Sequence, residues 1–120
     1  MTTSLPTVVS DYLAASDRGD LDALVTCFTE DALVLDEDRE WRGRAGIRRW
    51  REKVANAYEY TVEVRGVAEQ GSVDGVQHHD VLTHLEGNFP GGTVDLTFRF
   101  GLRDDRIATL QIVPTETAET

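Results

Sequence analysis

The stretch from Tyr12 to Asp36, YLAASDRGDLDALVTCFTEDALVLD, decides the fold of this chain. It predicts two short helices that meet at Gly19 and Asp20, because glycine suits the left-handed residue that ends a helix and aspartate caps the next one. A strand then carries Asp36 out of an apolar run. Such short helices bury little surface alone, so the remaining chain must supply a surface for them. We expect a curved sheet, with Tyr12 and Asp36 facing the hollow between helices and sheet.

Apolar residues recur at helical spacing in three segments. The stripes are Leu5, Val8, Val9, Tyr12 and Leu13; then Leu21, Leu24, Val25 and Phe28; then Ile47, Trp50, Val54 and Ala57. Cys27 is interpreted as a small core residue beside the second stripe. The other faces of the third helix hold Arg44, Arg48, Arg49, Arg51 and Lys53. These basic residues favour a solvated face over a surface that steers an anionic substrate.

From Tyr60 onward the hydrophobic period changes to two, which indicates strands. Residues 71–75 are predicted to form a turn between two of them. In the strand that follows, His79, Val81, Thr83 and Leu85 share one face, and His78, Asp80, Leu82, His84 and Glu86 share the other. The next strand alternates Val94, Leu96, Phe98, Phe100 and Leu102 with polar residues, and a last strand covers 106–113.

This order of elements predicts an α+β domain. We expect three N-terminal helices packed on one face of a strongly curved antiparallel sheet, which forms a cone enclosing a pocket. A concave, mostly apolar pocket is the usual place for a small-molecule site. The domain is predicted to cover 1–113, and the polar tail 114–120 is expected to be frayed.

Composition narrows the functional classes. The 120 residues allow one domain, and the net charge of −10 argues against nucleic acid or an anionic membrane surface as a partner. The single cysteine, Cys27, leaves no internal disulfide and no cysteine-based zinc site. The N-terminus MTTSLPTVV lacks the pattern of a signal peptide, and no apolar run approaches the roughly 18 residues of a membrane helix. A cytoplasmic location is expected.

Four segments of the chain resemble a known family. They are the opening stretch, RGRAGIRRW at 42–50, EVRGVAEQ at 63–70 and FRF at 98–100. Together they resemble the SnoaL-like and ketosteroid-isomerase-like branch of the NTF2-like superfamily. The resemblance implies the cone fold and a homodimer formed through the outer sheet face. The resemblance does not specify an activity, because the superfamily holds isomerases, cyclases, hydrolases, dehydratases and binding modules.

The resemblance also implies roles for individual residues. Tyr12 falls where the isomerases place the tyrosine that donates to the enolate, and Asp36 where they place the proton-shuttling aspartate. Their second donor is a protonated aspartate, whose position here is Leu96 (this enzyme is a worked example of a neutral buried carboxyl). Asp95 is one residue off and would point to the opposite face unless a bulge re-aims it. His79 takes a pocket position that is apolar in those enzymes.

Each candidate has a structural alternative. Asp36 is either a partly desolvated general base or an exposed turn residue. Tyr12 is either a donor to the substrate or a core tyrosine bonded to backbone or water. His79 could replace the missing donor and assist Asp36, or simply satisfy a buried hydrogen bond. Trp50, Phe28, Phe98 and Phe100 are either pocket walls or core.

Two other patterns do not predict sites. His78 and Asp80 could share an ion, but His84 lies about 20 Å from His78 along an ideal strand and cannot join them. No metal site is therefore predicted. The glycine-rich loop at 87–92 precedes a strand, which is the wrong context for a phosphate-binding loop.

The leading hypothesis is an enzyme without metal or organic cofactor that transfers protons on an apolar carbonyl compound. Asp36 would be the general base, Tyr12 the oxyanion donor and His79 an auxiliary donor or acid. Double-bond isomerisation and aldol-type cyclisation both fit. The predicted substrate-binding residues are Phe28, Trp50, Val81, Thr83, Leu96, Phe98, Phe100 and Leu110. The alternatives are a non-catalytic dimeric module that binds a small apolar ligand, and a structural dimer whose cavity is filled.

Overall fold

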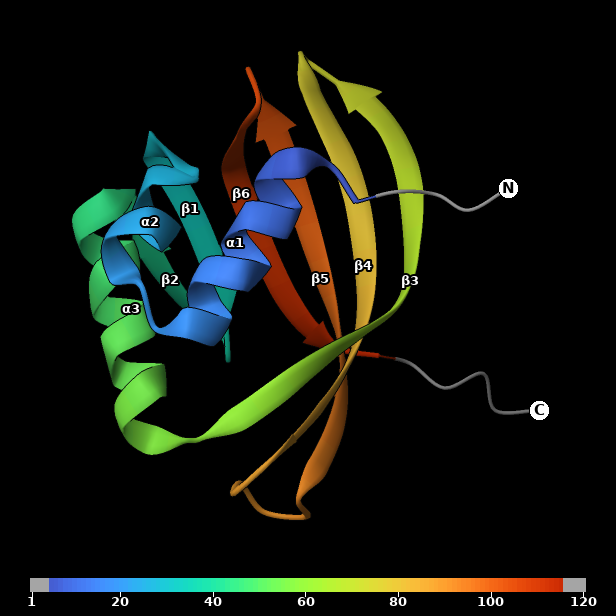
Figure 1. The fold of residues 1–120 in the computed structure, drawn as a ribbon. Coiled ribbons are helices and arrows are strands. Elements are labelled where there is room, and N and C mark those ends of the chain that lie inside the picture. The colour runs from blue at the N-terminus through green and yellow to red at the C-terminus, as the bar shows by residue number, and fades with distance from the viewer. Residues whose placement is uncertain (1–4, 116–120) are drawn as a thin grey trace.

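The computed structural model describes residues 5–115, apart from the side chain of Asn56 (Figure 1). In chain order its elements are α1 (Thr7–Arg18), α2 (Leu21–Thr26), β1 (Phe28–Asp36), β2 (Arg39–Arg42), α3 (Gly43–Ala57), β3 (Tyr60–Val73), β4 (Val76–Gly87), β5 (Thr93–Arg103) and β6 (Arg106–Pro114). The predicted frayed tail falls largely on 116–120, outside the described residues. No helix within 5–115 is long and apolar enough to cross a membrane.

The three helices lie on one side of a curved six-stranded sheet, with α1 running across its concave face (Figure 1). The strand order is β2-β1-β6-β5-β4-β3. The predicted α+β class and curved sheet are confirmed, and one detail of the prediction was wrong. The sheet is not purely antiparallel but mixed, because β1 pairs in parallel with β6. Strands β1 and β2 lie between α2 and α3, where the sequence also predicts a strand that ends at Asp36.

The junction between the first two helices follows the prediction. Gly19 adopts a left-handed conformation with φ of 70°, and its N–H donates to the carbonyl of Ser16. Asp20 caps α2 through Oδ1, which accepts from the Ala23 N–H at 3.1 Å. The tight turn between them sets α2 against α1 and directs the chain into the sheet.

Phe28 was predicted to lie on the buried face of the second helix, but it opens β1 and is fully buried there. Helix α2 stops at Thr26, and the carbonyl of Cys27 accepts from the Ile107 N–H of β6 at 2.8 Å. This bond to the last strand takes the place of a further helical turn. A residue at a helical spacing from Leu24 can equally begin a strand, so periodicity alone could not decide between the two.

The face assignments of β4 and β5 are confirmed. His79, Val81, Thr83 and Leu85 are buried toward the helices, and Phe98, Phe100 and Leu102 face the same way on β5. The turn expected at 71–75 is shorter than predicted, since β3 runs to Val73 and only Asp74 and Gly75 remain. Both turn residues have positive φ, which is the geometry that a two-residue hairpin requires.

Aromatic residues fill the centre of the cone. The Tyr12 ring meets both Phe28 and Phe100 edge to face, each with centroids 5.7 Å apart. Trp50 and Ile47 of α3 are also buried in this cluster. Edge-to-face pairs stabilise by about 0.5–1.5 kcal/mol each beyond their buried area, so Tyr12 is firmly held.

Candidate functional site

A hollow of about 680 Å³ opens beside the C-terminal half of α1, between α3 and the start of β3. We call it the Tyr12 hollow. Its size lies within the range of small-molecule sites. Its lining is Tyr12, Leu13, Ser16, Asp17, Arg51, Ala55, Tyr58, Glu59, Tyr60, Thr61, Val62, Val64, Glu86 and Phe98.

Tyr12 reaches this hollow from the buried stripe of α1. The residue is 1% exposed. Burial raises the pKa of the Tyr12 phenol; the Arg51 charge opposes that rise, while Tyr60 and Asp36 reinforce it. The phenol therefore stays protonated at neutral pH and can donate a hydrogen bond to a ligand.

Arg51 is a second polar residue of the hollow, and it comes from α3. Its side chain is buried, and its Nη2 donates to Ser16 Oγ at 2.9 Å and to the Tyr60 hydroxyl at 3.1 Å. The guanidinium also lies over the Trp50 ring, 5.0 Å from the centroid. Within the described part of the chain, no carboxylate forms an ion pair with it.

Asp36 is held by the indole of Trp50. Trp50 Nε1 donates to Asp36 Oδ2 at 2.9 Å, which joins the middle of α3 to the end of β1. Asp36 is half-buried and lies two residues after Val34, so both side chains face the helices. It is therefore not a freely solvated turn residue like its neighbours Glu37 and Asp38, which are exposed.

Asp36, Arg51 and Tyr12 act on one another electrostatically. Burial opposes the charge of Arg51, but Tyr12, Tyr60 and Asp36 together raise its pKa above the ordinary value. Asp36 likewise contributes to the raised pKa of Tyr12. Of these three residues, Tyr12 and Arg51 line the Tyr12 hollow, whereas Asp36 is bonded to Trp50 and is not among the lining residues.

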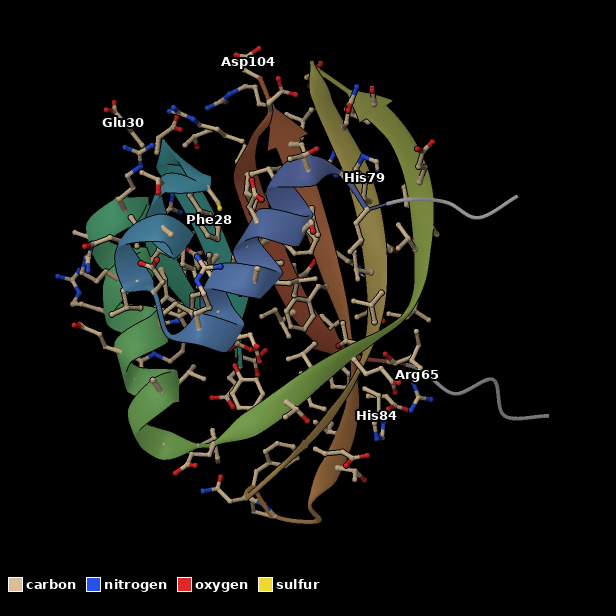
Figure 2. All side chains as sticks on the ribbon, viewed as in Figure 1. Phe28, Glu30, Arg65, His79, His84 and Asp104 are labelled. Atoms are coloured by element: carbon tan, nitrogen blue, oxygen red, sulfur yellow. The ribbon has the colours of Figure 1, made fainter. Side chains whose placement is uncertain are left out.

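His79 lies apart from this group. It lines a different hollow, of about 1140 Å³, beside the N-terminal half of α1, which we call the His79 hollow. Figure 2 shows His79 near that end of α1, and its strand partner Phe100 is the residue whose ring contacts Tyr12. Its buried Nδ1 has no hydrogen-bond partner among residues 5–115. His79 therefore does not line the Tyr12 hollow.

The predicted substrate-binding residues are placed as follows. Phe98 lines the Tyr12 hollow. Phe28, Trp50, Val81, Phe100 and Leu110 pack in the core, and Leu96 packs against it. Thr83 is buried, with its hydroxyl donating to the carbonyl of Leu96 at 2.9 Å. The same sequence pattern of aromatic and aliphatic residues occurs on strands that line a cavity and on strands that fill a core. Here most of these residues belong to the core.

Asp95 does not replace the missing donor at Leu96. Strands β4 and β5 pair without a bulge from 77 to 86, so Asp95 stays on the outer face of the sheet. There its Oδ1 lies 2.6 Å from His84 Nδ1, and Glu86 Oε2 lies 3.1 Å from Nε2. These hydrogen bonds, with Asp95 contributing most, raise the pKa of His84. Figure 2 shows His84 on this outer side, near Arg65.

Arg51 was missed as a site residue, because the basic residues of its helix were interpreted together as a solvated face. A usable signal was present in the sequence. Arg51 follows Ile47 by four residues and precedes Val54 by three, which places it on the apolar stripe of α3. Within residues 5–115, no three histidine, cysteine, aspartate or glutamate side chains are arranged to hold a metal ion.

Residues 9–110 match the model of the SnoaL-like domain family. A structure described as a "putative polyketide cyclase" from Sinorhizobium meliloti is 35% identical, with a TM-score of 0.80, and the match covers 91% of this chain and 95% of that one. A search of curated proteins finds no match.

Two more distant structures share the fold. A hypothetical protein from Catenulispora acidiphila with a ketosteroid isomerase-like fold, in complex with trimethylamine, is 19% identical, with a TM-score of 0.78. That match covers 93% of this chain and 88% of the other. An orange carotenoid protein from Anabaena, binding canthaxanthin, is 19% identical, with a TM-score of 0.82, over 98% of this chain and 38% of that one.

Proposed function

Because the chain belongs to the SnoaL-like family of the NTF2-like superfamily, we propose that it is an acid–base enzyme acting on an apolar carbonyl compound. The Tyr12 hollow would bind the substrate. Asp36 would remove a proton from the carbon next to the carbonyl, and Tyr12 would donate to the oxygen that becomes negatively charged. Isomerisation would follow if the proton returned elsewhere, and cyclisation if the enolate attacked a second carbonyl.

One observation carries this proposal: the half-buried carboxylate of Asp36 is fixed by a hydrogen bond from Trp50, and its charge acts on the buried phenol of Tyr12. A base held by one directional hydrogen bond keeps its second oxygen free to accept a proton. A neutral phenol next to a hollow supplies the donor that an enolate needs. The arrangement uses side chains alone, so the proposed reaction requires no metal or organic cofactor.

The experiment measures exchange of the α-protons of 2-tetralone for deuterium, followed by NMR. We expect the protein to accelerate exchange over buffer, and Asp36→Asn to reduce that acceleration by about 10²- to 10⁴-fold. The matched control is Asp38→Asn, which alters an exposed carboxylate two residues away and should leave exchange unchanged. Equal exchange by the Asp36 variant and the parent would overturn the role of Asp36.

A non-catalytic module that binds a small apolar ligand is the second candidate. The observation that favours it is Leu96, which leaves the hollow without the second acidic donor of the isomerases. Saturable binding of 2-tetralone with no acceleration of exchange would support this candidate over the enzyme. Failure of the compound both to bind and to exchange would count against both functions for this ligand class.

The homodimer and the domain boundary at residue 113 stay predictions. The outer sheet face carries the exposed Leu82 together with His78 and Asp80, and we propose it as the dimer surface. Light scattering after size-exclusion chromatography would show a dimer for the parent and a monomer for Leu82→Asp. A parent that is monomeric at all concentrations would contradict it.

A further inference from the structure

We infer that the Tyr12 hollow binds ligands that carry a carboxylate, and that Arg51 is the residue that pairs with it. This inference rests on the proposed function for the location of the site and adds the chemical class of its ligand. It begins from the unusual position of Arg51, a guanidinium that is only 8% exposed and has no acidic partner among the described residues.

A buried positive charge is costly unless a negative group compensates it. In this chain the compensation is incomplete. Ser16 and Tyr60 accept hydrogen bonds from Nη2 alone, and both acceptors are neutral hydroxyls. The negative charge of Asp36 helps to raise the pKa of Arg51, but the Asp36 carboxylate accepts its hydrogen bond from Trp50 and not from Arg51. The fold therefore keeps a cation in the wall of a hollow with part of its donor set unused.

Some exposed arginines of the same chain do pair with acidic residues. Arg48, one turn earlier on α3, pairs with Asp22 at 2.6 Å, and Arg103 pairs with Asp31 at 3.0 Å. The sequence has 22 acidic against 12 basic residues, so acidic partners are abundant. Arg51 lacks one although Asp17, Glu59 and Glu86 line the same hollow, where all three are exposed.

The guanidinium is also oriented in advance. Stacking on the Trp50 ring and the two bonds from Nη2 fix its plane, which lowers the entropy lost when a ligand binds. A planar guanidinium presents paired N–H groups that match the two oxygens of a carboxylate. Tyr12 lines the same hollow, and we assign its phenol as the second donor to the carboxylate.

The test compares two probes of nearly identical shape, naphthalene-2-carboxylate and naphthalene-2-carboxamide, by NMR titration of the intact protein. We expect the carboxylate to bind about ten- to a hundredfold more tightly, as charge-assisted hydrogen bonds predict. Arg51→Gln should bring the two affinities to within about twofold of each other, because the neutral amide removes the charge. Arg49→Gln, which alters an exposed arginine of the same helix, should keep the preference.

A readout on the parent protein covers the case in which Arg51→Gln does not fold. The Nε–H resonance of Arg51 should shift on adding the carboxylate and stay in place with the amide. Equal affinity for the two probes, no binding of the carboxylate at millimolar concentration, or an unshifted Arg51 resonance at saturation would each overturn the inference. Exchange of the neutral 2-tetralone does not depend on this pairing, so Asp36-dependent exchange could persist and the failure would concern the ligand class alone.

Discussion

Trp50 Nε1 donates a hydrogen bond to Asp36 Oδ2 across 2.9 Å, and this bond ties α3 to the end of β1. The same indole ring carries the Arg51 guanidinium on its face. One buried aromatic residue thus holds the negative Asp36 and contacts the positive Arg51, which lines the Tyr12 hollow. Changes at Trp50 should therefore disturb stability and function together.

The strength of the Trp50–Asp36 bond is accessible through a double-mutant cycle with Trp50→Phe and Asp36→Ala. We expect a coupling of about 0.5–2 kcal/mol in the free energy of unfolding, because the acceptor is charged but half-exposed. Urea denaturation of the parent, both single variants and the double variant measures it, and the cycle cancels the loss of ring volume. Additive effects, within about 0.3 kcal/mol, would show that the bond does not contribute to stability.

Tyr12 combines a packed ring with an available hydroxyl, and two substitutions separate these roles. Tyr12→Phe should cost less than about 1 kcal/mol, because the ring contacts with Phe28 and Phe100 persist. Tyr12→Ala should cost about 3–5 kcal/mol, by analogy with other buried aromatic residues. On the proposed function, Tyr12→Phe should still reduce proton exchange by about 10²- to 10³-fold. Full activity in Tyr12→Phe would remove the hydroxyl from the mechanism.

The raised pKa of Tyr12 should be visible in a pH titration of the folded protein. The folded state favours the neutral phenol, so Tyr12 should remain protonated above its ordinary value near 10, and stability should fall as the pH rises past that value. Ultraviolet titration of the folded parent and of Tyr12→Phe should therefore give the same phenolate absorbance up to about pH 11. An extra ionisation in the parent near pH 10 would contradict this expectation.

His84 should make stability depend on pH. Its hydrogen bonds to Asp95 and Glu86 raise its pKa in the folded state, so they stabilise the protein fully below the ordinary value of about 6.5. This contribution is lost as the pH rises through the folded value. The difference in unfolding free energy between the parent and His84→Gln should thus shrink from acid to alkaline pH, and added salt should reduce it. A difference that is constant with pH would exclude the ion pairs as its cause.

Gly87, at the end of β4 and opposite Tyr60 of β3, leaves no room for a side chain. A Cβ there would overlap the carbonyl of Glu59 and the Cα and Cβ of Tyr60. Gly87→Ala should therefore cost about 1–3 kcal/mol of stability, and it should disturb the Tyr12 hollow, which Glu59 and Tyr60 line. Gly66→Ala is a control for lost glycine, since its φ lies outside the left-handed region and the nearest atom to its Cβ would be Leu82 Cδ1 at 3.9 Å. Thermal unfolding of both variants would show whether crowding or backbone freedom dominates.

Much of the fold was accessible from the sequence, because strong local signals agreed with the tertiary structure. The Gly19-Asp20 helix junction and the alternating faces of β4 are local patterns, and both were predicted correctly. The parallel pairing of β1 with β6 was not accessible, since periodicity reveals a strand but not its partner. The same limit applies to His79. The face of β4 that carries it was predicted correctly, but His79 lines a different hollow from Tyr12.

For the candidate site, the sequence identified individual residues but not the residues that contact them. Tyr12 and Asp36 were selected by family resemblance, and the structure adds the bond from Trp50 and the nearby charge of Arg51. Asp95 was correctly expected to face outward in the absence of a bulge. Arg51 was overlooked because charge was weighed above position on the helix.

The parallel pairing of β1 with β6 bears on how the molecule assembles. Asp36 lies at the end of β1, and its strand partner Ile112 is supplied by the last strand of the sheet. Loop closure over such a separation in sequence is slow compared with the formation of local helices and hairpins. During synthesis on the ribosome, the Asp36 end of β1 cannot gain its neighbour until β6 has been translated. The region that carries the proposed base should therefore be among the last parts of the protein to become ordered.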